Sequence, residues 1–163
     1  MRPDPAKVLI VATRTAACDD LINVLTRRAA ASPARFNLLV PATPYGWAWL
    51  ADMHSGGVAA QRYLAAAAER YRDAGLELAA SWVGDPDPLA AVMDATHSAS
   101  YDEIVVCTLP RHLSRWLRLS LPHRVGAVTG LPVTHVVGTQ ARLTSRPDGR
   151  RTLHTEPATQ TVD

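Results

Sequence analysis

Five short apolar runs, each separated from the next by a stretch with helical spacing, constrain the fold of this chain more than any other feature. The first run, Val8-Leu9-Ile10-Val11-Ala12, is rich in β-branched residues, as is typical of a strand buried on both faces. Similar runs follow at 36–40, 76–83, 104–107 and 132–137. Strands that alternate with helices predict a doubly wound parallel sheet in an α/β domain.

Four intervening segments carry apolar residues three and four positions apart and are therefore predicted helices: 17–31, 58–74, 88–98 and 121–129. Gly75 and Gly130 follow two of them as helix stops. The sequence Asp85-Pro86-Asp87-Pro88 predicts an Asx cap with a proline in the first turn of the third helix.

The chain has 163 residues, of which 47% are hydrophobic and 20% charged, as expected for one globular domain. From residue 139 onward, polar residues and arginines dominate and cannot build a core. We therefore predict an α/β domain over 1–138 and a polar tail over 139–163, either mobile or docked on a partner.

No apolar run is long enough for a signal sequence or a membrane span, so we expect a cytoplasmic protein without a membrane partner. Cys18 and Cys107 lie far apart in the sequence and lack metal-ligand spacing. A disulfide between them is formally possible, but reduced thiols suit an intracellular protein better.

A net charge of +2 gives no case for nucleic-acid binding. The charge is unevenly distributed, however, because the stretch 104–147 holds six arginines, three histidines and no acidic residue. Arg111, His112 and Arg115 could hold an anionic ligand there. Alternatively, these residues form a solvated basic face or pair with acids elsewhere in the chain.

Ligands of doubly wound sheets bind beyond the carboxyl ends of the strands. Tyr45, Trp47 and Trp49 follow the second strand and could stack on a nucleobase or fill the crevice themselves. The candidate ligand-binding residues all lie at or after strand ends: Thr13, Arg14, Val40, Trp47, Cys107, Thr108, Arg111, His112, Arg115 and Ser120.

Cys107 is expected at the carboxyl end of the fourth strand, where basic neighbours could lower its pKa. The alternative is an inert buried thiol. No metalloprotease, nucleophile-elbow, Walker or dinucleotide motif is present, so we expect neither a metal site nor an enzyme.

Three segments resemble the universal stress protein family. Val83-Gly84-Asp85-Pro86-Asp87-Pro88 resembles the family's Gly-Asp-Pro turn before a helix, and Asp102-Glu103-Ile104-Val105-Val106 its Asp-Leu-Ile-Val strand. Leu131-Pro132-Val133-Thr134-His135-Val136-Val137 resembles its closing Cys-Pro-Val strand. The order and spacing of the five strands agree with the family over about residues 6–138.

The resemblance implies a flavodoxin-like, three-layer αβα domain with a five-stranded parallel sheet in the order 3-2-1-4-5, usually a homodimer. ATP-binding members carry G-x2-G-x9-G-[ST] after the fourth strand, where glycines let backbone amides approach phosphates. Here the loop aligns with one residue deleted, the three glycine positions and the aspartate that follows the family's first strand are replaced, and only the terminal hydroxyl remains, as Ser120. The replacements are Cys107, Pro110, Leu119 and Thr13. We therefore expect no cofactor, and no ATP bound in the family's manner.

These observations favour a non-enzymatic universal stress protein-like module that acts in stress response or regulation, through an unidentified protein partner or an anionic ligand. We expect a homodimer formed by the edge of the fifth strand, near Val133–Val137. The alternative is a nucleotide-binding protein that uses Arg111, Arg115, Ser120 and the Trp47/Trp49 loop. A nucleotidyl-transfer enzyme would need an H-x-G-H-like motif after the first strand, and Thr13-Arg14-Thr15-Ala16 offers none.

Overall fold

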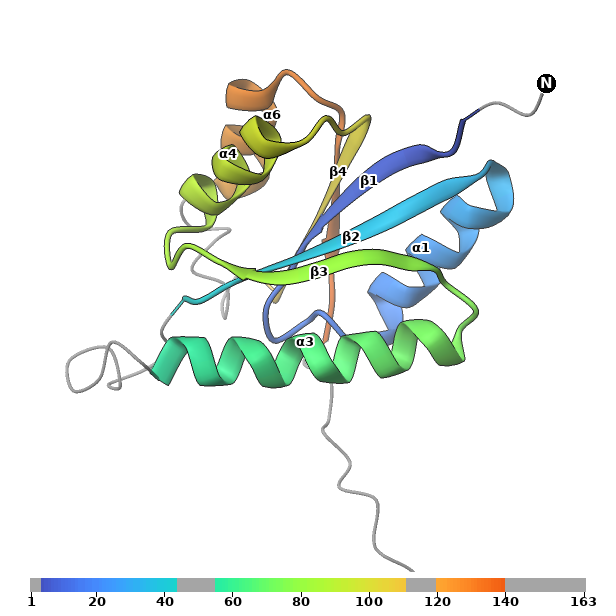
Figure 1. Ribbon diagram of the computed structural model, residues 1–163, viewed down its shortest axis with the longest axis horizontal. Helices are drawn as coiled ribbons and strands as arrows, with labels where there is room; N and C mark the ends of the chain where they lie inside the picture. The colour runs from blue at the N-terminus through green and yellow to red at the C-terminus, as the bar shows by residue number, and fades with distance from the viewer. Residues whose placement is uncertain (1–3, 44–54, 111–119, 140–163) are drawn as a thin grey trace, which may run out of the picture.

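The fold is a five-stranded parallel sheet between two layers of helices. The computed structural model describes residues 4–43, 55–110 and 120–139. The sheet has the order β3-β2-β1-β4-β5 (Figure 1), and its strands are β1 (Ala6–Val11), β2 (Ala34–Pro41), β3 (Leu78–Gly84), β4 (Glu103–Thr108) and β5 (Val133–Val137). The predicted αβα architecture and strand order are confirmed.

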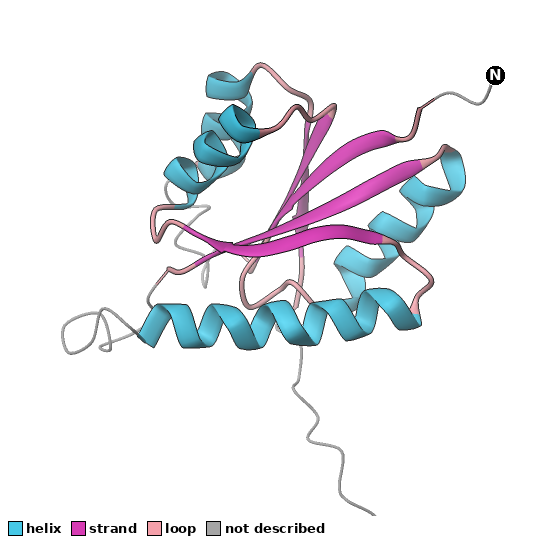
Figure 2. Cartoon of the chain, in the orientation of Figure 1, coloured by secondary structure: helices cyan, strands magenta, loops and turns pink. Residues whose placement is uncertain are grey.

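Helices cover both faces of the sheet (Figure 2). Helices α1 (Asp19–Ala31) and α3 (Ser55–Asp73) pack on one face, and α4 (Pro88–Ser98) and α6 (Leu121–Thr129) on the other. Side chains along β1 point alternately to the two faces of the sheet. Val8 and Ile10 pack in the core beneath α1 and α3, and Leu9 and Val11 in the core beneath α4 and α6. All four are fully buried, which explains why β1 is apolar without interruption.

Helix ends follow the local signals in the sequence. Asp87 caps α4 by accepting hydrogen bonds from the amides of Leu89 and Ala90, at 2.8 and 3.1 Å. Gly75 and Gly130 adopt positive φ angles of 72° and 67° at the ends of α3 and α6. The predicted cap and both predicted helix stops are therefore confirmed.

Several predicted boundaries are wrong; α3, for example, begins at Ser55 rather than at residue 58. β3 begins at Leu78 rather than at residue 76, because the amide of Leu76 bonds to the carbonyl of Tyr71 at 2.9 Å and completes the end of α3. α1 begins at Asp19 rather than at residue 17, because Cys18 adopts an extended conformation and serves as its N-cap. None of the described helices is both long and apolar enough to cross a membrane.

Candidate functional site

The carboxyl ends of β1 and β4 lie side by side at the centre of the sheet (Figure 1), where the chain reverses its direction of winding. In doubly wound folds this switch point is where ligands bind. Among the described residues, the buried polar side chains are three threonines, Thr13, Thr15 and Thr108, and all three follow or end one of these two strands. The polar chemistry of the interior is thus concentrated at this edge.

The loop after β1 is tied directly to the end of β4. The hydroxyl of Thr15 donates a hydrogen bond to the carbonyl of Cys107 at 3.0 Å. The Sγ atoms of Cys18 and Cys107 are 3.9 Å apart, and both side chains are buried. These contacts close the edge between the two strands from the side of α1.

The end of β4 is also tied to β5 and to the segment that follows it. The side-chain oxygen of Thr108 lies 2.8 Å from Nε2 of His135, and its carbonyl accepts a 2.8 Å hydrogen bond from the amide of Gly138. Partial desolvation lowers the pKa of His135. Both hydrogen-bonding groups of Thr108 that could face a ligand therefore have partners within the chain.

Gly138 and Thr139, which we call the strap, pass over the two thiols. A methyl group on Gly138 would collide with Sγ of Cys18 and lie 3.2 Å from Sγ of Cys107, so only glycine fits there. The amide of Thr139 donates to the carboxylate of Asp20 at 3.2 Å. The strap thus links β5 to the first turn of α1 across the site.

Two side chains of helix α3 hold the loop after β1 in place. The hydroxyl of the fully buried Tyr71 donates to the carbonyl of Ala16 at 2.8 Å, and burial raises the Tyr71 pKa. Arg70 donates to the carbonyl of Ala17 at 3.3 Å and forms an ion pair with Asp19. These bonds hold the loop against the sheet.

The structure brings several of the predicted site residues together. Thr13, Arg14, Cys107 and Thr108 lie at the carboxyl edge of β1 and β4, while the buried Val40 lies near the end of the neighbouring β2. The remaining predicted residues in the aromatic and basic loops lie outside the described residues: Trp47, Arg111, His112 and Arg115.

Ser120 is the remaining predicted site residue, and it lies exposed at the start of α6. Its φ of 52° is in the left-handed region that favours glycine, and its side chain makes no capping hydrogen bond to the helix. Ser120 therefore combines a strained backbone conformation with an exposed position and a side chain that does not cap the helix.

Of the two alternatives for Cys107, the structure supports the buried thiol and contradicts a thiol whose pKa is lowered by basic neighbours. Its pKa is raised, first by its hydrogen bond with Cys18 and then by burial, rather than lowered by basic neighbours. The pKa of Cys18 is lowered to about 7, mainly through the same bond. From the sequence alone, a disulfide between the two cysteines was only a formal possibility, and no local pattern predicted that their side chains would meet. The proximity of the two cysteines could have been predicted from the topology, because the end of β4 and the start of α1 both lie at the carboxyl edge of the sheet.

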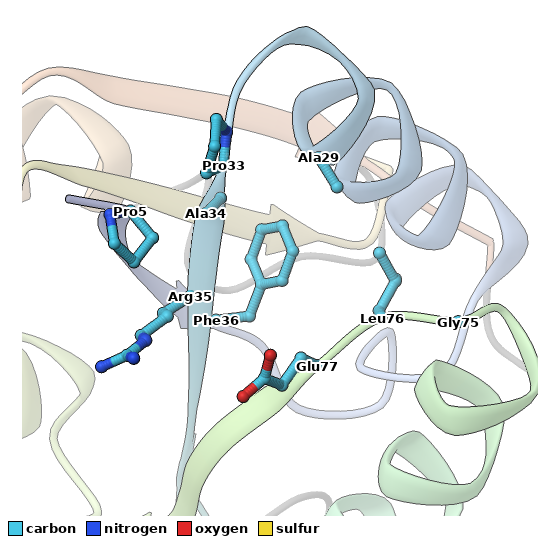
Figure 3. A pocket seen from close by; sticks show the side chains of 9 residues that line it. All are labelled: Pro5, Ala29, Pro33, Ala34, Arg35, Phe36, Gly75, Leu76 and Glu77. Carbon is cyan, nitrogen blue, oxygen red and sulfur yellow. The ribbon is translucent and has the colours of Figure 1, made fainter. Parts of the chain in front are cut away.

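A shallow hollow of about 340 Å³ lies at the opposite edge of the sheet (Figure 3). Its lining includes Pro5, Arg35, Phe36, Leu76 and Glu77, which lie at or before the first residues of β1, β2 and β3. A hollow at the amino ends of parallel strands is away from the position where such sheets bind ligands, so we place the candidate site at the carboxyl edge. Within the described ranges, no group of three or more His, Cys, Asp or Glu side chains could hold a metal ion.

The comparison with known proteins agrees with this architecture. No family model matches the chain, and no curated protein matches it in sequence. A universal stress protein solved in complex with cAMP is similar in structure, with 19% identity over 82% of this chain and 98% of that chain and a TM-score of 0.56.

Two further solved structures are similar. A universal stress protein family protein from Arabidopsis thaliana with AMP bound is 14% identical over 83% of this chain and 93% of its own, with a TM-score of 0.59. A universal stress protein from Archaeoglobus fulgidus is 15% identical over 80% of this chain and 93% of its own, with a TM-score of 0.56. The chain therefore has the fold of the universal stress proteins, as its three sequence motifs predict.

Proposed function

We propose that this chain is a universal stress protein-like module without enzymatic activity, which does not hold ATP in the family's usual manner. It acts in stress response or regulation, through a protein partner or a different anionic ligand. The main support is the closure of the carboxyl edge between β1 and β4 by contacts within the chain. Thr15 binds the carbonyl of Cys107, and Gly138 binds that of Thr108.

A phosphate at this edge would need backbone amides that it can approach closely. Cys107 and Pro110 stand where the family's loop has glycines, and proline has no amide hydrogen to donate. The Cys107 side chain is buried against Cys18 and beneath the strap. A triphosphate would have to displace hydrogen bonds worth about 0.5–1.5 kcal/mol each before it gained any contact of its own.

The alternative function is nucleotide binding through Arg111, Arg115, Ser120 and the Trp47/Trp49 loop. Two observations favour it: two of the similar structures hold cAMP or AMP, and Ser120 lies at an exposed position in a strained backbone conformation. A ligand bound by arginine forks and stacked aromatic rings would not need the lost glycines.

Titration with ATP, AMP and cAMP, followed by tryptophan fluorescence and thermal shift, distinguishes the two functions. The proposal predicts no saturable response to ATP at millimolar concentration. A saturable response that is lost in Arg111→Ala would establish the alternative instead. An exposed arginine on α6, Arg124, provides the matched control, because Arg124→Ala removes the same charge at a residue that the alternative does not use.

We expect the protein to work in the cytoplasm as a homodimer formed by the edge of β5. β5 is the last strand of the sheet, and Val137 is 49% exposed on it. Val137→Lys should convert the dimer to a monomer in sedimentation velocity. Val58→Lys, which places the same charge at a valine on α3 that is 59% exposed, should not. A wild-type protein that sediments as a monomer would refute this assembly.

A further inference from the structure

Cys18 and Cys107 form a buried dithiol at the centre of the fold. Their sulfur atoms are 3.9 Å apart although the residues are 89 positions apart in the chain. Cys18 is the N-cap of α1, and Cys107 is the next-to-last residue of β4. The two side chains are 2% and 1% exposed, and both thiols are free.

The geometry brings the sulfurs within reach of a covalent bond. An S–S bond is about 2.05 Å long, so the two atoms must approach by roughly 1.9 Å, which rotation of the side chains can share. Because Gly138 has no side chain, its backbone lies directly over both sulfurs without separating them. Within the described residues, no group of three or more potential metal ligands includes these two thiols, so those residues offer no four-ligand zinc site.

The two thiols are not equivalent. Cys18 Sγ accepts a 3.4 Å hydrogen bond from the amide of Leu21 at the N-terminus of α1, where the helix dipole favours a negative charge. The pKa of Cys18 is lowered to about 7, mainly by its hydrogen bond with Cys107, so a substantial fraction of Cys18 is thiolate near neutral pH. The pKa of Cys107 is raised by its bond to Cys18 and by burial, so it remains a thiol. Cys18 is therefore the nucleophile of the pair and Cys107 its partner.

We propose that Cys18 and Cys107 form a reversible intramolecular disulfide when the protein meets hydrogen peroxide, and that the strap controls access to them. The pair would make the switch point of the sheet a peroxide-sensitive site. This inference does not depend on whether the protein binds a nucleotide.

The reaction has two steps. The Cys18 thiolate attacks one oxygen of H₂O₂, the O–O bond breaks, and the leaving hydroxide takes up a proton to become water, which leaves a sulfenic acid on Cys18. The Cys107 sulfur then attacks the Cys18 sulfur, the S–O bond breaks, and the hydroxide leaves as water with the Cys107 proton. Two thiols thus give up two electrons and two protons, and the peroxide is reduced to two waters. A dithiol reductant reverses the reaction by exchange and is itself oxidised to a disulfide.

Access to the sulfurs requires movement of the strap. It is held by the hydrogen bond from Gly138 to the carbonyl of Thr108 and by that from Thr139 to Asp20, at 2.8 and 3.2 Å. With the strap in this position, the side chains of Cys18 and Cys107 are almost inaccessible to solvent. The rate of oxidation should therefore follow the fraction of molecules in which the strap is open.

The first test treats the reduced full-length protein with a modest excess of H₂O₂ and maps its peptides by mass spectrometry without reduction. We expect a Cys18–Cys107 peptide pair that is two hydrogens lighter, complete loss of free thiols, a monomeric denatured chain, and full recovery with dithiothreitol. Unchanged thiols, or a disulfide between two chains, would overturn the proposal. This test needs no variant and so does not depend on how substitutions fold.

Variants test the order of the steps. In Cys107→Ser the sulfenic acid has no thiol to react with, so dimedone should label Cys18. In Cys18→Ser, oxidation of Cys107 should be at least about tenfold slower, because a thiol is a far poorer nucleophile than a thiolate. Equal rates in the two variants would contradict the assignment of Cys18 as the nucleophile.

The strap is tested by Thr139→Pro, which removes the amide hydrogen donated to Asp20 without changing any charge. Thr139→Ala keeps that amide and serves as the control. We expect oxidation to be roughly two- to tenfold faster in the proline variant, as loss of one hydrogen bond allows, and unchanged in the alanine variant. Equal oxidation rates in the two variants would show that the strap does not control access to the thiols.

Discussion

The hydroxyl of Thr15 donates a hydrogen bond to the carbonyl of Cys107 across 3.0 Å, and this bond, beside the contact between the Cys18 and Cys107 thiols, joins the loop after β1 to the end of β4. Both groups are buried, so neither can exchange its partner for water. The bond occupies the part of the sheet edge at which a doubly wound fold ordinarily receives its ligand.

Removal of this bond should destabilise the protein. Thr15→Val keeps the shape of the side chain and leaves the carbonyl of Cys107 buried without its donor, which costs about 1–3 kcal/mol. Thr43→Val removes a similar 3.0 Å bond to Pro86 at the surface and should cost less than about 0.5 kcal/mol. Urea unfolding of the reduced proteins measures both values, and equal losses would contradict the importance of burial here.

The strap should tolerate no side chain at position 138. Gly138→Ala places a methyl group in collision with Cys18, so we expect a loss of about 1–3 kcal/mol in the free energy of unfolding. Gly57→Ala is the matched control, because a methyl group there meets nothing within 4 Å and the residue lies in α3. That substitution should stabilise the protein by about 0.5–1 kcal/mol. A neutral Gly138→Ala variant would show that the strap does not rest on the thiols.

Acid should weaken the fold through His135. Its pKa in the folded protein lies below its value of about 6.5 in the unfolded chain, so the unfolded state binds the extra proton first. Stability is then fully present above pH 6.5 and falls as the pH drops through the folded-state pKa. His135→Gln should flatten this part of the pH profile, whereas His97→Gln, at an exposed position on α4, should leave it unchanged. If the stability of wild type, His135→Gln and His97→Gln changed with pH in the same way, the prediction would be contradicted.

The disulfide proposed for Cys18 and Cys107 should stabilise the oxidised protein. A bond between residues 89 positions apart restricts a long loop of the unfolded chain, which is worth about 2–4 kcal/mol. Loss of the Cys18 cap on Leu21 would offset about 1 kcal/mol of this gain. Unfolding of peroxide-treated wild type and of treated Cys107→Ser separates the disulfide from other oxidation, and equal shifts in both would contradict the prediction.

Much of the fold could be predicted because its signals are local. The uninterrupted apolar character of β1, the capping carboxylate of Asp87 and the positive φ angles of Gly75 and Gly130 each depend on neighbours within a few residues. These features, combined with the alternation of strands and helices, were sufficient to predict a doubly wound parallel sheet, whereas the strand order came from the resemblance to the universal stress protein family.

The candidate site was less predictable because its contacts join distant parts of the chain. Cysteine is not a typical N-cap residue, so the sequence around Cys18 does not predict that it caps α1. Nor does that sequence predict that Cys18 lies beside Cys107. The strap over these thiols depends on where β5 ends relative to α1. Such relationships appear only once the sheet has brought its strand ends together.

The central claim, that the chain itself closes the edge where the family's nucleotide would lie, is tested most directly by site-resolved NMR. Backbone amide shifts of the reduced protein are recorded as ATP is added to millimolar concentration. We predict no saturable shift at Thr13, Thr15, Cys107 or Thr108. Saturable shifts at these amides, together with loss of the Thr15–Cys107 hydrogen bond, would contradict the account.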